Sequence, residues 1–524
     1  MTRQITRRDL LKLGSTAAVS AVTIPLLPAG TAFAERLAPR NLPAVSSGVS
    51  PKSADELCFM RAVDLARALR NKEVSAREVM AAHLKQIQHV NSQVNAIVTL
   101  VPEETLLSQA AAADEAWAKR KSLGALHGLP VGVKDLLETK GIRTTYGSPL
   151  HKDFIPASDC VLVEREKNAG AIVIGKTNVP EFGLGSQSFN PVFGATKNPY
   201  DLTKTCGGST GGGSVAVACG MVPLADGSDM GGSLRNPPNF CNIVGLRPSP
   251  GRVSNGPGQL GWMPLSVDGC VARNVTDLAF FLSVLAGFDD GLPISIDQPG
   301  SVFARPLGTR SFKGVRVAMF EDLGLPWEPE VKSAIKAQAK VFESLGCVVE
   351  EADPDFSDAN ESFLAWRHWA LERAFGEALV KHGDQLNEYV HWHVEEGRKL
   401  TGPYLSRIEA KRTALYNCFN EFLKRYEFFI APVNQVLPFD VNVHYPREIA
   451  GAKMENYLAW MKSAYYISAV GNPAMSVPAA FSSSGLPIGM QIVGRHHDDW
   501  GVLQLGYAFE QATNIGRRRP AIAH

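Results

Sequence analysis

Residues 206–252 read CGGSTGGGSVAVACGMVPLADGSDMGGSLRNPPNFCNIVGLRPSPGR, a glycine-rich stretch in which a Gly-Gly-Ser triplet occurs twice. The triplets, at 207–209 and 231–233, flank a run of small apolar residues at 215–224. Glycines beside a serine permit backbone conformations in which successive N–H groups point into one small space. Such a nest stabilises the negative charge that develops during acyl transfer. A serine there is well placed to attack a carbonyl, but no base lies next to it in the sequence.

The composition is that of an ordinary globular protein and argues against one class of function. The chain has 524 residues, of which 45% are hydrophobic and 20% charged, so it can bury a large core and hold more than one domain. Its 53 Lys and Arg balance 52 Asp and Glu, which argues against a nucleic-acid partner. The 8 cysteines are scattered, with no CxxC pair and no zinc spacing.

The first 34 residues have the features of a twin-arginine export signal. Residues 6–12 read TRRDLLK, a mildly apolar segment follows at 13–27, and Ala-Phe-Ala at 32–34 offers a cleavage site. A membrane anchor is the alternative, but the apolar segment is short and two prolines interrupt it. We therefore predict that residues 1–34 are a cleaved signal peptide.

The residues after this signal predict where the mature protein resides. Residues 35–52 carry Pro, Ser and Ala without periodicity and are predicted to form a flexible leader. No later segment reaches the ~20 consecutive apolar residues that a membrane-spanning helix needs. We expect no stable membrane anchor after processing, and a periplasmic or secreted protein.

Helix and strand patterns alternate along most of the remaining chain. Ser53 and Ser75 are each followed three residues later by Glu, which predicts two capped helix starts. Periodicity predicts further helices at 103–119, 161–170, 215–221, 275–287 and 501–511, and apolar runs predict strands at 128–135, 171–175, 428–432 and 485–494. Charge and tryptophan rise between about residues 328 and 425, which predicts a helical insertion and not further sheet.

Two other kinds of site compete with the glycine clusters. Gly207-x-Ser209-x-Gly211 matches the nucleophile elbow of α/β-hydrolases, and His444 or His496 could complete a triad. That elbow needs a buried strand directly before it, whereas residues 198–204 are polar and proline-broken. The histidine clusters at 391–393 and 496–499 could bind a metal, but they lack a zincin motif and are better interpreted as solvated surface histidines.

Four motifs in a fixed order resemble one enzyme family. They are GLPVGVKD at 128–135, CGGSTGGGS at 206–214, DMGGSLRNPPNFCNIVGLRPSPGRVS at 229–254 and GLPIGMQIVGR at 485–495. Together they resemble the amidase signature hydrolases, and the resemblance covers nearly all of the mature chain. It implies an amidase domain at 53–518 with an α/β fold. In that fold a mixed, mainly parallel sheet is covered by helices on both faces, with the helical insertion added.

The resemblance implies a Ser–cis-Ser–Lys triad. Ser233 matches the nucleophile, and Ser209 matches the bridging serine, whose peptide bond to Gly208 should be cis. Lys134 matches the general base. The chemistry is coherent, because a buried lysine that desolvation keeps neutral can accept a proton relayed by Ser209, so no histidine is needed.

Further residues are expected to support this triad. The oxyanion hole is expected to consist of the backbone N–H groups of Met230, Gly231, Gly232 and Ser233. Asp229 and Arg235 are expected to hold the loop in place. The family usually has a second serine at position 210, where this chain has Thr210, so the hydroxyl is retained and a methyl is added.

The predicted reaction is hydrolysis of a carboxylic amide to an acid and an amine or ammonia, without metal or cofactor. The expected partner is a small-molecule amide, and a homodimer is compatible with the sequence. Three aromatic residues of the loop at 176–199, Phe182, Phe189 and Phe193, are expected to shape an apolar pocket. Two alternatives stay open, namely a protein resembling the A subunit of glutamyl-tRNA amidotransferase and a carbamate or ester hydrolase of the same family.

Overall fold

A mixed sheet of eleven strands forms the centre of the described chain. The structure, a computed structural model, describes residues 53–119, 124–256, 258 and 260–524, so the predicted signal peptide and leader lie outside it. All described residues belong to one structural unit. The strands, in their order across the sheet, are β1 (Ile97–Leu100), β3 (Ile172–Thr177), β2 (Pro130–Lys134), β8 (Leu224–Asp229), β10 (Val267–Ala272), β9 (Val244–Arg247), β16 (Ala474–Phe481), β17 (Pro487–Val493), β13 (Phe428–Pro432), β11 (Arg316–Met319) and β12 (Val348–Glu351).

The sheet is mixed, as predicted, and its parallel pairings lie in two blocks. One block is β3-β2-β8 and the other is β13-β11-β12. Between them, β8, β10, β9, β16, β17 and β13 pair antiparallel in that order, and β1 is an antiparallel edge strand on β3. The parallel part of the predicted mixed, mainly parallel sheet is therefore confined to these blocks, and the residues of the predicted triad lie at the first one.

Helices cover both faces of this sheet, as predicted. On one face α8 (Asn236–Phe240) packs against Gly245 of β9, and α7 (Gly211–Ala218) lies over β8. On the other face Gly506 of α16 (Asp499–Thr513) lies against Met475 of β16, together with α6 (Val161–Asn168) and α9 (Val275–Leu285). Side chains alternate along each strand, so the two layers contact different residues of the same strands.

Two of the four N-terminal helices, α2 (Ala54–Phe59) and α4 (Ala76–Val94), begin where the capping signals at Ser53 and Ser75 predict. The other two are α3 (Ala62–Asn71) and α5 (Glu103–Ala118). The Ser53 side chain accepts from the Glu56 N–H at 3.2 Å, and Ser75 forms a complete capping box with Glu78. Helix α7 differs from the prediction, because it begins at Gly211 instead of residue 215. The first turn of α7 therefore contains Gly211, Gly212 and Gly213. Gly212 lies so close to the Asn178 backbone that no larger residue fits there.

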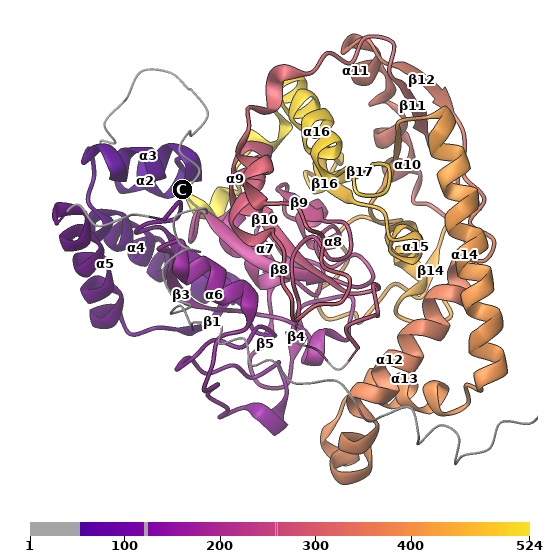
Figure 1. The fold of residues 1–524 in the computed structure, drawn as a ribbon, viewed down its shortest axis with the longest axis horizontal. Helices are drawn as coiled ribbons and strands as arrows, with labels where there is room; N and C mark the ends of the chain where they lie inside the picture. Colours follow the sequence, from indigo (N-terminus) through magenta and orange to yellow (C-terminus); the bar gives the residue numbers. More distant parts are fainter. Residues whose placement is uncertain (1–52, 120–123, 257, 259) are drawn as a thin grey trace, which may run out of the picture. The chain divides into compact units, whose positions relative to one another are not determined.

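The segment predicted as a helical insertion is mostly helical but also contributes a strand. Its helices are α10 (Pro329–Lys336), α11 (Ala339–Ser344), α12 (Ala359–His382), α13 (Glu388–Arg398) and α14 (Gly402–Arg425). Strand β12 extends the main sheet beside β11, so the expectation of no further sheet is wrong at this point. Its two glutamates obscured the strand pattern. Helix α12 packs against α13, α14 and α15 (Lys462–Val470). Figure 1 shows α12, α13 and α14 in orange.

Short elements complete the described fold. Three two-stranded ribbons are β4–β5 (Phe189–Asn190, Gly194–Ala195), β6–β7 (Lys197–Asn198, Asp201–Thr205) and β14–β15 (Glu448–Ile449, Ala452–Lys453). The 3₁₀ turns are η2 (Pro149–His151), η3 (Glu181–Gly183), η4 (Gly300–Ala304), η5 (Leu307–Thr309), η6 (Gly383–Gln385), η7 (Ala459–Met461), η8 (Ile515–Arg517) and η9 (Ala521–Ala523).

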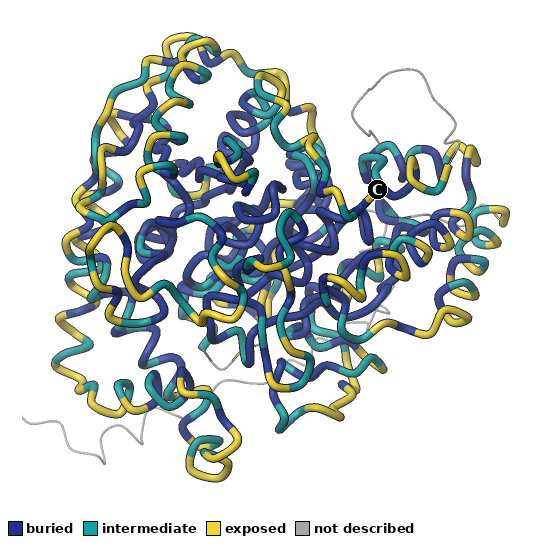
Figure 2. Tube along the Cα trace, turned by 180° about the vertical axis from the view of Figure 1, so that it is seen from behind, coloured by how far each residue is buried: buried dark blue, intermediate teal, exposed yellow. Residues whose placement is uncertain are grey.

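Burial is greatest around the central strands. Every residue of β2, β9, α7 and α8 is buried, whereas α5 and α14 carry many exposed residues, a contrast that Figure 2 shows in dark blue and yellow. All eight cysteines fall within the described residues, and none forms a disulfide. Within the same residues, no helix has the length and apolar character needed to cross a membrane.

Candidate active site

Three segments of the first parallel block bring the predicted triad residues together. Lys134 is the last residue of β2, and Ser209 lies in the loop directly before α7. Ser233 lies in the loop that joins β8 to α8. In parallel neighbouring strands the carboxyl ends meet at one edge, so the end of β2 and the loop after β8 are close in space.

The Lys134 ammonium faces oxygen acceptors on two sides. Its Nζ donates to Ser209 Oγ at 2.8 Å and to Thr210 Oγ1 at 2.9 Å. On the other side it donates to Ser228 Oγ at 3.0 Å and to the Ser228 carbonyl at 3.3 Å. All these acceptors are uncharged, so no carboxylate touches the amine and locks it in the ammonium form.

Burial changes the protonation of this lysine. The Lys134 side chain is fully buried, and desolvation lowers its pKa to about 7 against the opposing charges of Asp268, Asp226 and Asp229. Burial disfavours the charged form of an amine, and the three carboxyl groups recover only part of that cost. An amine with this pKa is substantially neutral near pH 7 and can accept a proton, which a general base must do.

Ser209 has the backbone geometry that the family resemblance implies. The peptide bond between Gly208 and Ser209 is cis. The Ser209 side chain is buried, and Gly183 of η3 lies over it. Its Oγ accepts a hydrogen bond from Lys134, and Ser209 also lines the cavity that contains Ser233.

Thr210 keeps the hydrogen bond that its hydroxyl could make. Besides accepting from Lys134, its Oγ1 donates to the Ser228 carbonyl at 3.4 Å. The added methyl group lies beside Gly227 and Gly213. A side chain at Gly227 would collide with this methyl group, so two glycines create the space that a threonine requires here.

Ser233 opens into a small cavity of about 110 Å³. The residue is half-buried, and its hydroxyl makes no hydrogen bond with another described residue. The cavity walls combine apolar side chains with polar ones. The polar side chains of the lining are Ser209, Ser228, Ser233, Ser266, Arg367 and Tyr457. The two serines of the predicted triad thus share one compartment.

The N–H groups expected to form the oxyanion hole are not equivalent. The Gly232 N–H donates to Asp229 Oδ1 at 2.9 Å, so it is engaged inside the loop instead of free for a substrate. The N–H groups of Met230, Gly231 and Ser233 have no acceptor among the described residues. Three of the four predicted donors can therefore stabilise an oxyanion. Gly232 has a φ of 126°, which favours glycine.

Asp229 and Arg235 fix this loop, together with Arg247. Asp229 accepts from the N–H groups of Gly232 and Leu234 and from both guanidinium groups, at 2.9–3.1 Å. Burial by itself would raise the pKa of Asp229, but the two arginines outweigh it and hold that pKa well below its ordinary value. The carboxylate stays ionised, so the loop conformation does not depend on pH near neutrality.

Sequence reasoning missed several residues of the site. Ser228 contacts Lys134 through two atoms, and Asp226 accepts from the Lys134 backbone N–H at 2.7 Å. Burial raises the pKa of Asp268 to about 7, with the Lys134 charge opposing that rise. These residues belong to the segments LADGSD and VDGCVA, whose polar and glycine residues hide two buried strands.

The α/β-hydrolase alternative does not fit the geometry. A short strand, β7, does precede the first glycine cluster, but it belongs to a separate ribbon with β6 and not to the central sheet. His444 packs on Phe189 and His496 stacks on His497. Among the described residues neither histidine forms a hydrogen bond with the Ser209 hydroxyl, which accepts from Lys134.

His393 is not the surface residue that the sequence suggested. It is fully buried and contacts Tyr457 and His368, with Nε2–Oη and Nδ1–Nδ1 distances of 2.7 and 3.0 Å. The buried residues Tyr389, Val390, His393 and Val394 recur at helical spacing, a signal that could have identified its inward position. Within the described residues, no group of three His, Cys, Asp or Glu side chains could hold a metal ion.

Of the three phenylalanines expected in the pocket, only Phe182 lines the cavity. Phe189 packs on His444, and Phe193 lies under the Arg143 guanidinium at 5.1 Å. The loop therefore contributes one aromatic wall instead of three, because its ribbon turns the other two rings away.

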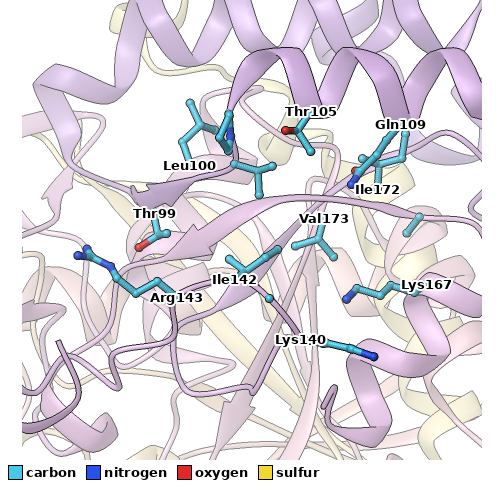
Figure 3. A pocket seen from close by; sticks show the side chains of 14 residues that line it. Thr99, Leu100, Thr105, Gln109, Lys140, Ile142, Arg143, Lys167, Ile172 and Val173 are labelled. Carbon is cyan, nitrogen blue, oxygen red and sulfur yellow. The ribbon is translucent and has the colours of Figure 1, made fainter. Parts of the chain in front are cut away.

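A larger cavity of about 580 Å³ lies elsewhere, at the β1 edge of the sheet. Figure 3 shows its side chains, which come mainly from β1, β3, α5 and the loop after β2, with Lys167 from α6. Its cationic residues are Lys140, Arg143 and Lys167, and Lys167 pairs with Asp159 at 2.7 Å. None of the predicted catalytic residues, Lys134, Ser209 and Ser233, lines this cavity, and its lining contains no serine, histidine or carboxylate.

Comparisons with known proteins identify the family of this chain. The family described as Amidase matches residues 78–503. The chain belongs to the amidase family. It is accordingly a hydrolase that acts on amide carbon–nitrogen bonds.

Relatives of this amidase have more than one described activity. It is 32% identical over 470 residues to an acylamidase of Rhodococcus erythropolis, which covers 89% of this chain and 98% of the relative. It is 33% identical over 498 residues to the A subunit of the glutamyl-tRNA(Gln) amidotransferase of Alkaliphilus metalliredigens, with 88% and 98% covered. Among solved structures, a bacterial aryl acylamidase of the amidase signature family superposes with a TM-score of 0.81 at 26% identity, covering 88% and 99%. A 6-aminohexanoate cyclic dimer hydrolase shares the fold, with a TM-score of 0.79 at 24% identity and 89% and 100% covered.

Proposed function

We propose that this amidase cleaves a carboxylic amide through an acyl-enzyme on Ser233, with Ser209 and Lys134 moving the protons. One observation carries this proposal. A fully buried lysine with a pKa lowered to about 7 by burial lies 2.8 Å from the hydroxyl of Ser209, which shares a cavity with Ser233. A neutral amine behind one hydroxyl can activate a second hydroxyl in that cavity.

Acylation begins with neutral Lys134. The amine takes the proton of the Ser209 hydroxyl, while Ser209 takes the proton of Ser233. The Ser233 Oγ forms a bond to the amide carbon, and the carbonyl oxygen becomes an oxyanion held by the free N–H groups of Met230, Gly231 and Ser233. When the oxyanion reforms the carbonyl, the carbon–nitrogen bond breaks. The leaving nitrogen receives a proton from Ser209, which Lys134 reprotonates.

Deacylation uses the same groups on a water molecule. Water gives a proton to Ser209, which passes a proton to neutral Lys134, and the water oxygen bonds to the acyl carbon. Collapse of this second intermediate expels the Ser233 oxygen, which takes the proton back through Ser209. The products are a carboxylic acid and an amine or ammonia, and the enzyme returns to its starting protonation state. Each oxyanion donor of this kind is worth about 10²–10³ in rate.

A pair of variants tests the assignment of the nucleophile. Ser233→Ala should lower amide turnover by about 10⁵–10⁶-fold, as removal of a serine nucleophile does elsewhere, and should prevent labelling by a fluorophosphonate. Ser482→Ala, a change in a serine outside the cavity lining, is the matched control and should keep both. Near-normal hydrolysis by purified Ser233→Ala, with an unchanged melting temperature, would dismiss the mechanism.

The amidotransferase relatives support a second candidate, a protein that resembles their A subunit and works with a partner. Turnover by the isolated chain distinguishes the two proposals. If it hydrolyses amides as a homogeneous species in gel filtration, no partner is needed. Activity that appears only when another protein is added would favour the amidotransferase. The same purified chain, offered matched amide, ester and carbamate substrates, tests for the carbamate or ester hydrolase.

Export through the twin-arginine pathway, with cleavage after residue 34, is a further proposal supported by the sequence at residues 6–34. Fractionation of cells that express the wild type and an Arg7→Lys, Arg8→Lys variant tests it. The wild type should reach the periplasm or medium, whereas the variant should stay in the cytoplasm. Light scattering on the mature chain tests the predicted homodimer.

A further inference from the structure

One arginine of the cavity lining has no role in the chemistry described so far. Arg367 comes from α12 and lines the same cavity as Ser233. Its side chain is only 4% exposed. Its Nη1 donates to the Met230 sulfur at 2.8 Å, and Met230 directly precedes the second glycine triplet. A fixed positive charge therefore lies beside the loop that carries the nucleophile.

The hydrogen-bond partners of Arg367 are weak or neutral. Besides the Met230 thioether, a weak acceptor, Nε donates to His393 Nε2 at 3.2 Å and Nη2 to Tyr457 Oη at 3.0 Å. A guanidinium has five N–H donors, so these partners leave part of its capacity unused. Among the described residues, no carboxylate forms an ion pair with it.

The neighbouring histidines supply no compensating charge. Burial, assisted by the Arg367 charge, holds the pKa of His393 well below its ordinary value. Burial and the same charge lower the pKa of His368 to about 4. Both rings are thus neutral near pH 7, and the pocket around Arg367 keeps a net positive charge.

Other buried arginines of this protein have partners of a different kind. Arg235 and Arg247 share the Asp229 carboxylate, and Arg252 pairs with Asp499. Arg273 donates to backbone carbonyls, at 2.8–3.2 Å. Buried charges are normally paired in one of these ways, because removal from water is costly. Arg367 departs from this pattern at the one cavity that contains the nucleophile.

The remaining cavity wall combines hydroxyl groups with apolar side chains and contains no acidic residue, which limits what Arg367 can bind. Its apolar residues are Leu136, Phe182, Leu184, Leu371, Leu458 and Met461. The volume of about 110 Å³ is smaller than the ~150 Å³ of a cavity that accepts benzene. A short acyl chain fits such a space, and a carboxylate at its end would meet the guanidinium.

We propose that the substrates of this amidase carry a carboxylate a few bonds from the scissile carbonyl, and that Arg367 binds this carboxylate. The inference rests on the proposed amidase function and names its substrate class, short monoamides of dicarboxylic acids. A guanidinium binds a carboxylate through two parallel hydrogen bonds, which fixes orientation as well as charge. Arg367 thereby holds the acyl chain, while Ser233 performs the chemistry.

The test compares two primary amides of equal length. One ends in a carboxylate, and the other ends in an isopropyl group of nearly the same shape. The wild type should hydrolyse the first with a kcat/KM about 100-fold higher, chiefly through a lower KM. The isopropyl amide leaves the buried guanidinium without a partner, which weakens its binding. Arg367→Met should bring this ratio close to one, and Arg367→Lys should retain part of it.

A control variant at a half-buried arginine separates recognition from the general effect of losing an arginine side chain. Arg412 on α14 donates to the Ala469 carbonyl at 3.2 Å and does not line the cavity. Arg412→Met should keep the ratio between the two amides. If it lowers the ratio as far as Arg367→Met does, the assignment to Arg367 is wrong.

The outcomes for the substrate class and for the proposed function can be told apart. If the wild type hydrolyses both amides through Ser233 at equal kcat/KM, the inference is overturned and the amidase proposal stands. If neither amide is hydrolysed, titration of succinate into Ser233→Ala decides the inference without turnover. Its Kd should be at least tenfold weaker when Arg367→Met is added. Equal affinities would overturn the inference, and absent fluorophosphonate labelling of Ser233 would count against the amidase proposal.

Discussion

Two buried lysines on neighbouring strands have similar acidity but different surroundings. Lys134 ends β2, and Lys176 lies on β3 opposite Val133, one position out of register with Lys134. Because side chains alternate along a strand, the two lysines extend from opposite faces of the sheet. Burial lowers the pKa of Lys134 to about 7 and that of Lys176 to about 8.

Their hydrogen-bond partners separate them. Lys134 contacts the hydroxyls of Ser209, Thr210 and Ser228, which can each exchange a proton. Lys176 donates to the backbone carbonyl of Leu137, which cannot give up a proton, and to Thr139 Oγ1 at 2.9 Å. Burial thus lowers the pKa of both lysines. Only Lys134 can act in catalysis, because only its amine contacts a hydroxyl that shares a cavity with the proposed nucleophile.

The largest expected effect comes from exchanging each lysine for methionine. Lys134→Met should lower kcat by about 10³–10⁴-fold, because the general base is lost. Lys176→Met should keep the kcat of the folded enzyme within about threefold, a small change of the kind expected away from the reacting atoms. Steady-state kinetics on both variants measure the difference. Comparable losses of kcat in the two variants would contradict the view that only Lys134 acts as the general base.

The same Lys176→Met variant should lose stability. The change leaves the Leu137 carbonyl and the Thr139 hydroxyl without their buried partner, which costs about 1–3 kcal/mol. Denaturant unfolding of the wild type and the variant, with amide turnover assayed beside it, measures this. An unaltered unfolding free energy would show that Lys176 does not hold the loop after β2.

A smaller effect is expected at Thr210. Thr210→Val removes the hydroxyl that accepts from Lys134 and should lower kcat about tenfold, as loss of a hydrogen bond to a charged group does. Thr210→Ser keeps the hydroxyl and should restore most of that activity. Equal kcat values for the valine and serine variants would show that the hydroxyl is dispensable.

The smallest expected effect is a displacement of the pH profile. Activity should fall as the pH drops through about 7, because protonated Lys134 cannot accept a proton. The Asp268 charge favours that protonated form, so Asp268→Asn should move the acid limb of kcat/KM to lower pH. A limb that moves to higher pH would contradict the electrostatic role given to Asp268.

Several elements were predictable because their patterns are long or clearly capped. The helix starts after Ser53 and Ser75 follow from capping residues, and strands such as β13 and β17 follow from apolar runs. Strand β8 was missed because LADGSD contains two aspartates and a glycine. Pairing with β2 and β10 on its two sides stabilises it, and that information lies far away in the sequence.

The triad residues lie in motifs, whereas their surroundings do not. Lys134, Ser209 and Ser233 could be named from short patterns that resemble a family. Arg367 could not, because its contact with Met230 joins residues 137 positions apart. The engaged N–H of Gly232 was equally hidden, since only the folded loop shows that Asp229 accepts from it.

The rate at which a fluorophosphonate labels Ser233, followed by mass spectrometry across about pH 5.5 to 9, tests the activation of this serine most directly. We predict labelling that rises with a midpoint near pH 7, is lost in Lys134→Met and persists in Lys176→Met. Labelling at a rate independent of pH, or undiminished in Lys134→Met, would contradict it.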